Sequence, residues 1–208
     1  HRISKAEEAY LWGVAAEAQR FGSPIGVMSQ HAEQLINSVA PGHAKYTGWG
    51  WKEPNTHVFL RQLCLEINNL TYIHVIRHGL DMAFSANRQQ AQNWGPHFGI
   101  ERDRLEDPVP SAMLDYWIAA NESVIGNGSA LLNDRFFLLN FDALCAEPLQ
   151  IINRLCVFLA ADVSREQRLR LAALPRTPQS TGRFRAFALA QFTAEQLASV
   201  RRFGYTTS

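Results

Sequence analysis

Two short runs of apolar, β-prone residues are the predicted strands of this chain. TYIHVI occupies residues 71–76 and RFFLLNF occupies residues 135–141. The first is apolar nearly throughout, a pattern typical of a parallel strand that is covered on both faces. A stretch with helical periodicity follows each run. Strands that alternate with helices predict one α/β domain, built on a parallel sheet flanked by helices.

Helices are predicted where apolar residues recur every three or four positions. The first covers residues 4–21, where Ser4 and Glu7 have the spacing of a capping box. The helix over 111–126 is expected to end at Gly126. The other helices are expected at residues 29–39, 56–68, 80–92, 148–159, 164–173 and 193–203.

The segments between these helices have distinct compositions. FGSPIG (21–26) breaks the first helix through its glycines and proline, and TGWGWK (47–52) is a short, aromatic, strand-like run. Residues 93–110 are rich in glycine, proline and charge, which predicts a loop over the site. PRTPQSTGRFRAF (175–187) is predicted to be a basic loop.

The composition is that of an ordinary globular protein and limits the partners. The 208 residues carry a formal net charge of +1, which gives no reason to expect nucleic-acid binding, so any anion site must be local. We expect no signal peptide, and the printed sequence has no uncharged apolar run long enough to predict a membrane span. Cys64, Cys145 and Cys156 are odd in number and lack metal-ligand spacing. We therefore expect reduced thiols, no bound metal and a cytoplasmic protein.

The charged residue at the end of the first predicted strand is the main candidate for chemistry. In an open α/β sheet, ligands gather at the carboxyl ends of the strands. Arg77 follows YIHVI directly, Gly79 permits a tight turn, and Ser85 falls in the first turns of the helix expected from Leu80. A guanidinium and a hydroxyl near a helix N-terminus suit a phosphate group. The alternative is that Arg77 pairs with a structural carboxylate such as Asp81 and that Ser85 is merely exposed.

Several stretches around Arg77 have the order and spacing of a known set of motifs. RHGLDMAFS (77–85) fits a pattern R-[D/N]-x-x-[D/x]-x-x-x-S, with His78 replacing the usual acidic or amide residue. Residues 51–79 fit the order K-x-P, helix, strand, R-x-G, and residues 135–160 fit a later strand, proline and helix. STGRFR (180–185) and the closing FGY complete the set. Together they resemble the sulfotransferase family that uses 3′-phosphoadenosine 5′-phosphosulfate (PAPS), closest to its tyrosylprotein and bacterial branch.

The resemblance implies a fold, a reaction and a cofactor site. It implies a P-loop nucleotide-hydrolase-like architecture and transfer of a sulfuryl group from PAPS to a hydroxyl or amine of a small-molecule, sugar or peptide acceptor. It also implies that Arg77 and Ser85 bind the 3′-phosphate and that Gly182, Arg183 and Arg185 form a second clasp on it, without a metal. A solvated basic loop is the alternative for the last three residues.

The catalytic side chains are predicted around the start of the helix expected at residues 56–68. Lys52 occupies the place of the family's K-x-P lysine and suits the sulfuryl oxygens as a point charge, with a snorkelling surface lysine as the alternative. The general base is open between His57 and Glu53, which would otherwise be a helix-surface histidine and an ordinary turn residue. His74 lies inside a strand and is expected to be a core residue.

The acceptor pocket has no motif of its own. Acceptor pockets are built from variable loops, so the candidates are residues 93–110 and the aromatic side chains Trp49, Trp51 and Trp94. The oligomeric state cannot be inferred from these patterns. A bacterial-type cytoplasmic location is preferred over the Golgi lumen.

One expected motif is missing from the printed sequence. The family carries a G-x-x-R-S-G-T loop that cradles the 5′-phosphosulfate, and GSPIG (22–26) does not fit it. The chain also opens at His1 without a methionine. We therefore expect a single sulfotransferase-like domain over 1–208 that lacks its first strand–loop–helix unit, at least ~30 residues long.

Two other functions remain open on the sequence. A protein that has lost the phosphosulfate loop would be a non-catalytic module that binds 3′-phosphonucleotides. A P-loop kinase-like phosphotransferase is disfavoured, because the chain has no G-x-x-x-x-G-K-[S/T] and no clear pair of magnesium-binding carboxylates.

Overall fold

The computed structural model describes residues 50–106 and 109–208, together with positions 5, 6, 8, 9, 12, 13, 16, 33, 37 and 48. The chain forms two compact units, His1–Lys52 and Glu53–Ser208, and each is described by itself. In the first unit, the described positions from 5 to 37 are helical, in agreement with the helices expected at 4–21 and 29–39. Gly48 and residues 50–52 have no regular structure, so the strand expected over 47–52 is wrong where the chain is described. FGSPIG lies outside the described residues.

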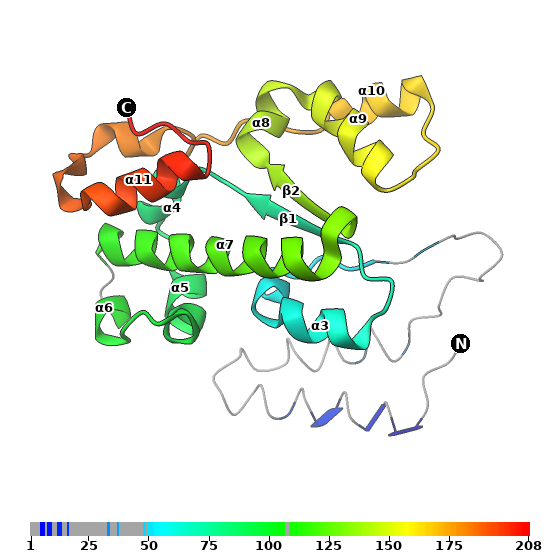
Figure 1. Cartoon of the computed structure of the whole chain (residues 1–208), viewed down its shortest axis with the longest axis horizontal. Helices are drawn as coiled ribbons and strands as arrows, with labels where there is room; N and C mark the ends of the chain where they lie inside the picture. The colour runs from blue at the N-terminus through cyan, green and yellow to red at the C-terminus, as the bar shows by residue number, and fades with distance from the viewer. Residues whose placement is uncertain are drawn as a thin grey trace. The chain divides into compact units, whose positions relative to one another are not determined.

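The second unit is a mainly helical fold around a small sheet (Figure 1). Its strands are β1 (Tyr72–Ile76) and β2 (Phe136–Asn140). Its helices are α3 (Leu60–Glu66), α4 (Gly79–Ala83), α5 (Gln89–Trp94), α6 (Asp103–Glu106), α7 (Pro110–Leu132), α8 (Phe141–Ala146), α9 (Pro148–Phe158), α10 (Arg165–Ala172) and α11 (Ala194–Arg202). Short 3-10 turns cover Thr56–Phe59, Gly95–Phe98, Asn133–Arg135, Arg183–Ala186 and Leu189–Gln191.

The two strands are parallel neighbours, as their sequences predict. Tyr72 pairs with Phe136, and the register continues to the pair Ile76 and Asn140. Both strands end at the same level, so Arg77 and Phe141, which follow them, lie at the same end of the sheet. The carboxyl ends of the strands are the place where ligands gather in α/β folds.

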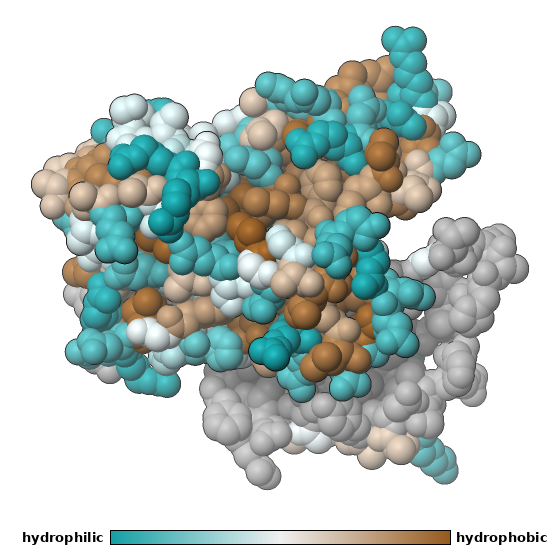
Figure 2. Space-filling model, in the orientation of Figure 1, coloured by the Kyte–Doolittle hydropathy of each residue, from teal (hydrophilic) through white to brown (hydrophobic). Residues whose placement is uncertain are grey.

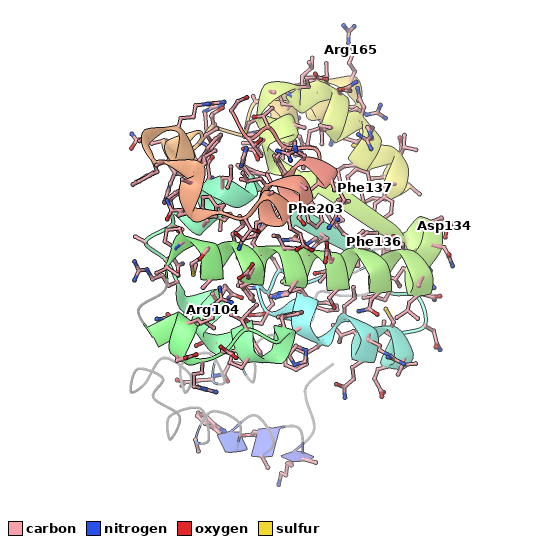
Figure 3. The ribbon with its side chains drawn as sticks, turned by 60° about the vertical axis from the view of Figure 1, so that its left-hand side comes forward. Arg104, Asp134, Phe136, Phe137, Arg165 and Phe203 are labelled. Carbon is pink, nitrogen blue, oxygen red and sulfur yellow. The ribbon has the colours of Figure 1, made fainter. Side chains whose placement is uncertain are left out.

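Helices cover both faces of the sheet (Figure 1). Side chains alternate along a strand, so Phe136 and Phe137 project from opposite faces of β2 (Figure 3). On one face, Phe136 packs so closely on α7 that a Cβ added to Gly128 would lie 2.4 Å from its ring. On the other face, the rings of Phe137 and Phe158 of α9 are 5.0 Å apart. The sheet is therefore the middle layer between α7 and the pair α8 and α9.

The strands are less fully covered than their apolar sequences predict. Val75 is 51% exposed and Leu138 is 39% exposed. Figure 2 shows apolar atoms at the surface between α7 and α9, over the strands. Within the described residues each strand pairs only with the other, so both outer edges of the sheet lack a neighbouring strand.

Several helix boundaries differ from the prediction. The helix expected over 80–92 is two short helices, α4 and α5, and the loop expected over 93–110 contains a 3-10 turn and α6. The helix over 56–68 begins as a 3-10 turn and ends at Glu66. α7 continues six residues beyond Gly126, where Gly128 lets the helix pack closely on the partly buried ring of Phe136.

Candidate functional site

Arg77 lies at the carboxyl end of β1, in contact with the end of β2 and with a loop far along the chain. Its Nη2 donates a hydrogen bond to Ser180 Oγ at 3.1 Å, and its guanidinium lies 5.6 Å from the centre of the Phe141 ring. Its Nε is buried and has no hydrogen-bond partner among the described residues. An arginine with an unused buried donor at a strand end fits the side of a site that receives an anion.

The alternative for Arg77, an ion pair with Asp81, is not formed. The Asp81 carboxylate is 3% exposed and accepts hydrogen bonds from two backbone groups, Gly182 N at 2.7 Å and Phe184 N at 3.1 Å. No carboxylate of the described residues lies within ion-pair distance of Arg77. The positive charge of the guanidinium is therefore not paired with a carboxylate of the described residues.

The loop 180–185 lies against α4, on the side of Arg77. Gly182 has a left-handed backbone (φ +77°), and Arg183 donates to the carbonyl of Phe84 at 3.1 Å. Arg185 folds back over the ring of Phe184, 5.2 Å from its centre. The structure thus brings Arg77, Arg183 and Arg185 to one short helix, although a hundred residues separate the first from the other two.

Ser85 does not lie near the start of a helix, so that expectation is wrong. α4 has only five residues and ends at Ala83, and Ser85 follows it in the connection to α5. The Ser85 hydroxyl accepts a hydrogen bond from Asn87 N at 3.2 Å. Because Arg183 binds the carbonyl of Phe84, Ser85 is still adjacent to the loop 180–185. α4 stands between Arg77 and Ser85, and its rise is about 7.5 Å.

Three residues to which the motifs assigned no role, Asp142, His78 and Tyr205, lie close together at the carboxyl ends of the strands. Asp142 Oδ2 accepts a hydrogen bond from His78 N at 3.0 Å. The His78 ring lies 4.6 Å from the Phe184 ring and 4.9 Å from the Tyr205 ring. The Tyr205 hydroxyl is buried without a partner among the described residues, and burial and Asp142 raise its pKa while Arg77 lowers it. The conspicuous sequence signal for this group is the closing FGY.

The three predicted catalytic residues have different surroundings. Lys52 is exposed and belongs to the first unit. The Glu53 carboxylate accepts from Asn55 N and, at 2.8 Å, from Asn55 Nδ2. His57 Nδ1 lies 2.8 Å from the Pro54 carbonyl and Nε2 lies 3.2 Å from the Tyr116 hydroxyl. Because a carbonyl only accepts, Nδ1 carries the proton and Nε2 accepts from the tyrosine.

His74 lies within β1, as predicted, and is partly buried rather than in the core. Its Nε2 lies 2.8 Å from Asn121 Oδ1, which belongs to α7. Burial lowers the pKa of His74, and it also lowers the pKa values of His57 and His78. All three histidines therefore favour the neutral form in the folded protein.

The stability of the protein should decrease on acidification. Histidines in the unfolded chain titrate near 6.5, and His57, His74 and His78 have lower pKa values in the fold. Below pH 6.5 the unfolded chain binds more protons than the folded chain. The free energy of unfolding therefore decreases as the pH is lowered, until the three histidines of the folded protein are protonated as well. Urea denaturation at pH 7.5 and 5.5 measures this, and His74→Gln should make the dependence shallower. A stability that rises towards pH 5.5 would contradict the assignment.

The predicted aromatic candidates for the acceptor pocket are placed only in part. Trp94 Nε1 donates to Asn55 Oδ1 at 2.8 Å, and its ring meets Phe59 edge to face at 5.6 Å. Trp94 therefore packs the segment at Asn55 against α5. Trp51 is 45% exposed in the first unit, and Trp49 lies outside the described residues.

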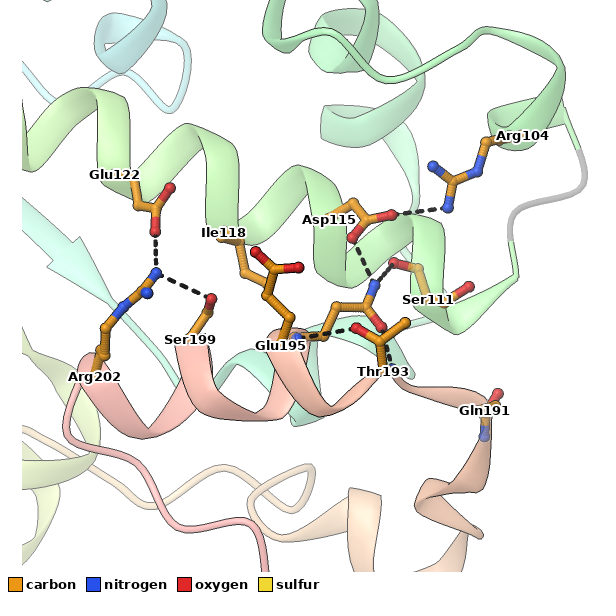
Figure 4. Close-up of a pocket in the computed structure, with 11 residues that line it drawn as sticks. Arg104, Ser111, Asp115, Ile118, Glu122, Gln191, Thr193, Glu195, Ser199 and Arg202 are labelled. Atoms are coloured by element: carbon orange, nitrogen blue, oxygen red, sulfur yellow. Dashed lines mark hydrogen bonds and ion pairs between the residues drawn. The ribbon is translucent and has the colours of Figure 1, made fainter.

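A polar groove of about 500 Å³ lies between α7 and α11 (Figure 4). Four of its charged side chains form two pairs: Asp115 accepts from Arg104 at 2.8 Å, and Glu122 accepts from Arg202 at 2.6 Å. Gln196 of α11 also donates to Asp115. These pairs hold α11 and α6 to α7, so we assign the groove a structural role.

Within residues 50–106 and 109–208 and the isolated positions before them, no group of three or more His, Cys, Asp or Glu side chains is placed to hold a metal ion. No helix in the described part of the chain is long and apolar enough to cross a membrane. The three cysteines, Cys64, Cys145 and Cys156, are free thiols.

Comparison with known proteins agrees with the motifs around β1. A family model described as the Sulfotransferase family matches residues 5–165, more than half of the chain. The match includes Lys52, Arg77 and Ser85, and it ends before the loop 180–185. We found no curated protein and no solved structure that matches the chain. Because this match covers more than half of the chain, the chain belongs to the sulfotransferase family.

Proposed function

We propose that the chain transfers a sulfuryl group from PAPS to an acceptor hydroxyl or amine, and that Arg77 and the loop 180–185 bind the 3′-phosphate of this donor. The observation that carries the proposal is the cluster at α4. Arg77 directly precedes this helix, Arg183 binds the Phe84 carbonyl at its end, and Arg185 belongs to the same loop as Arg183. Within the described residues, the buried Nε of Arg77 has no hydrogen-bond partner and no carboxylate forms an ion pair with Arg77. Membership in the sulfotransferase family supplies the reaction class.

The residues present fit a phosphate of the donor. Guanidinium groups offer fixed charge and forked donors, and Ser85 adds a hydroxyl next to the backbone that Arg183 binds. The N–H of Gly182 is already used by Asp81, so the loop would bind the phosphate through its arginine side chains. The donor, when bound, supplies the activated sulfuryl group.

Transfer requires charge neutralisation at the sulfuryl oxygens and removal of the acceptor proton. Lys52 is our candidate for the first task, as an exposed cation in the stretch matched by the family. His57 is a better candidate base than Glu53. Its Nε2 is an acceptor and burial favours its neutral form, whereas the Glu53 oxygens already bind Asn55. In this account the acceptor hydroxyl or amine replaces the Tyr116 hydroxyl as the hydrogen-bond donor to His57 Nε2.

The test is transfer of ³⁵S from labelled PAPS to a panel of sugars, phenols, amines and tyrosine peptides. We expect label in at least one acceptor class, and its loss in Arg77→Ala. Binding of PAPS without transfer to any acceptor would favour the non-catalytic binding module. Absence of both binding and transfer would contradict the proposed function.

A further inference from the structure

A buried carboxylate on α4 fixes the loop that carries two of the three clustered arginines. Asp81 is 3% exposed, and each of its oxygens accepts one backbone hydrogen bond: Oδ2 from Gly182 N at 2.7 Å and Oδ1 from Phe184 N at 3.1 Å. Charge-assisted bonds of this kind are about twice as strong as neutral ones. Because both oxygens are used, an amide side chain cannot replace the carboxylate fully.

Asp81 binds the loop at Gly182 and Phe184, and two further hydrogen bonds involve Ser180, at the start of the loop, and Arg183, between those two residues. Ser180 Oγ accepts from Arg77, and Arg183 donates to the Phe84 carbonyl. The ring of Phe184 is 1% exposed and fills the space beside His78. The position of the loop therefore decides where Ser180 holds the Arg77 guanidinium and where Arg183 leaves the backbone.

We propose that Asp81 is a positioning residue for anion binding: it holds the loop 180–185 so that the guanidinium groups of Arg77 and Arg183 face one ligand. The inference rests on the proposed function for the identity of that ligand, a 3′-phosphonucleotide. Asp81 itself does not contact the ligand, since backbone N–H groups occupy both of its oxygens.

The sign of the effect separates positioning from simple electrostatics. A carboxylate near an anion site repels the anion, so Asp81→Asn would strengthen binding if charge alone mattered. In the positioning account the same substitution weakens binding. The amide nitrogen cannot accept from the backbone N–H that it faces, so one of the two hydrogen bonds that Asp81 makes to the loop is lost. A purely structural role predicts neither change once the protein is folded.

The experiment compares Asp81→Asn with Asp115→Asn by calorimetry with 3′,5′-ADP as the probe, and by amide hydrogen exchange. Asp115 is a matched control, because its carboxylate also bridges two partners, Gln196 and Arg104, which lie on α11 and α6. We expect affinity on the order of 10-fold weaker in Asp81→Asn, as for the loss of an outer hydrogen-bond partner in other sites, and unchanged affinity in Asp115→Asn. The amides of Gly182 and Phe184 should exchange faster only in Asp81→Asn.

Each outcome decides one claim. Equal or tighter binding by Asp81→Asn overturns the positioning role while the proposed function stands. If the unsubstituted protein does not bind 3′,5′-ADP, the proposed function fails and so does the ligand claim. Hydrogen exchange still tests the hold on the loop in that case: unchanged exchange at Gly182 and Phe184 in Asp81→Asn overturns it.

Discussion

Replacing Trp117 with alanine should lower the free energy of unfolding by about 3–5 kcal/mol, the usual loss for a buried tryptophan. Trp117 is 7% exposed on α7 and packs against two other segments. A Cβ added to Gly79 would lie 2.7 Å from its ring, and the rings of Phe203 and Tyr205 are 4.8 Å and 6.2 Å away. The indole therefore joins α7 to the start of α4 and to the C-terminal segment.

Urea denaturation followed by far-UV circular dichroism measures this loss. The free energy of unfolding of Trp117→Phe should lie between those of the unsubstituted protein and Trp117→Ala, because phenylalanine keeps part of the aromatic contact. Val157→Ala is the control: Val157 is 78% exposed, so its change should stay within about 0.5 kcal/mol. A loss below about 1 kcal/mol in Trp117→Ala would show that the contacts of Trp117 with Gly79 and Tyr205 contribute little to the stability of the fold.

The sheet could be predicted from local sequence. The apolar runs that became β1 and β2 have strand composition, and a helical stretch follows each one, which predicts parallel pairing. The position of Arg77 at the strand end followed from the same pattern. The exposure of Val75 could not be predicted, since it depends on which elements cover the sheet.

The predicted helix boundaries were wrong where side chains form hydrogen bonds that compete with those of the helix backbone. Ser85 and Asn87 each accept a backbone hydrogen bond two residues on, from Asn87 N and Gln89 N, and these turns interrupt the helix expected over 80–92. Both residue types favour such turns, so the signal was present but weaker than the apolar periodicity. α7 passed Gly126 for the opposite reason, because packing on Phe136 outweighs the low helix propensity of glycine.

The candidate site was predicted partly through family motifs. No local pattern links Arg77 to Ser180, which lie 103 positions apart in sequence, and only the resemblance placed the loop 180–185 near the phosphate site. The actual partners of Asp81 could not be predicted for the same reason. A carboxylate four residues after an arginine suggests an ion pair, yet the chain brings two backbone N–H groups to it from the distant loop.

Arg77→Ala should weaken binding of 3′,5′-ADP by about 10- to 150-fold, which corresponds to about 1.5–3 kcal/mol for a hydrogen bond to a charged group. Arg77→Lys should recover only part of this, because lysine lacks the forked donors. Arg154→Ala is the matched control, since the Arg154 guanidinium also lies over a phenylalanine ring, 5.5 Å from the centre of Phe137, but Arg154 belongs to α9. It should leave the affinity unchanged.

The most direct test of the account is calorimetric titration of the unsubstituted protein with 3′,5′-ADP and with 5′-AMP, which differ only in the 3′-phosphate. If Arg77 and the loop 180–185 bind that phosphate, 3′,5′-ADP binds at least about tenfold more tightly, and the difference disappears in Arg77→Ala. Equal affinity for the two nucleotides, or a preference that survives in Arg77→Ala, would contradict the account.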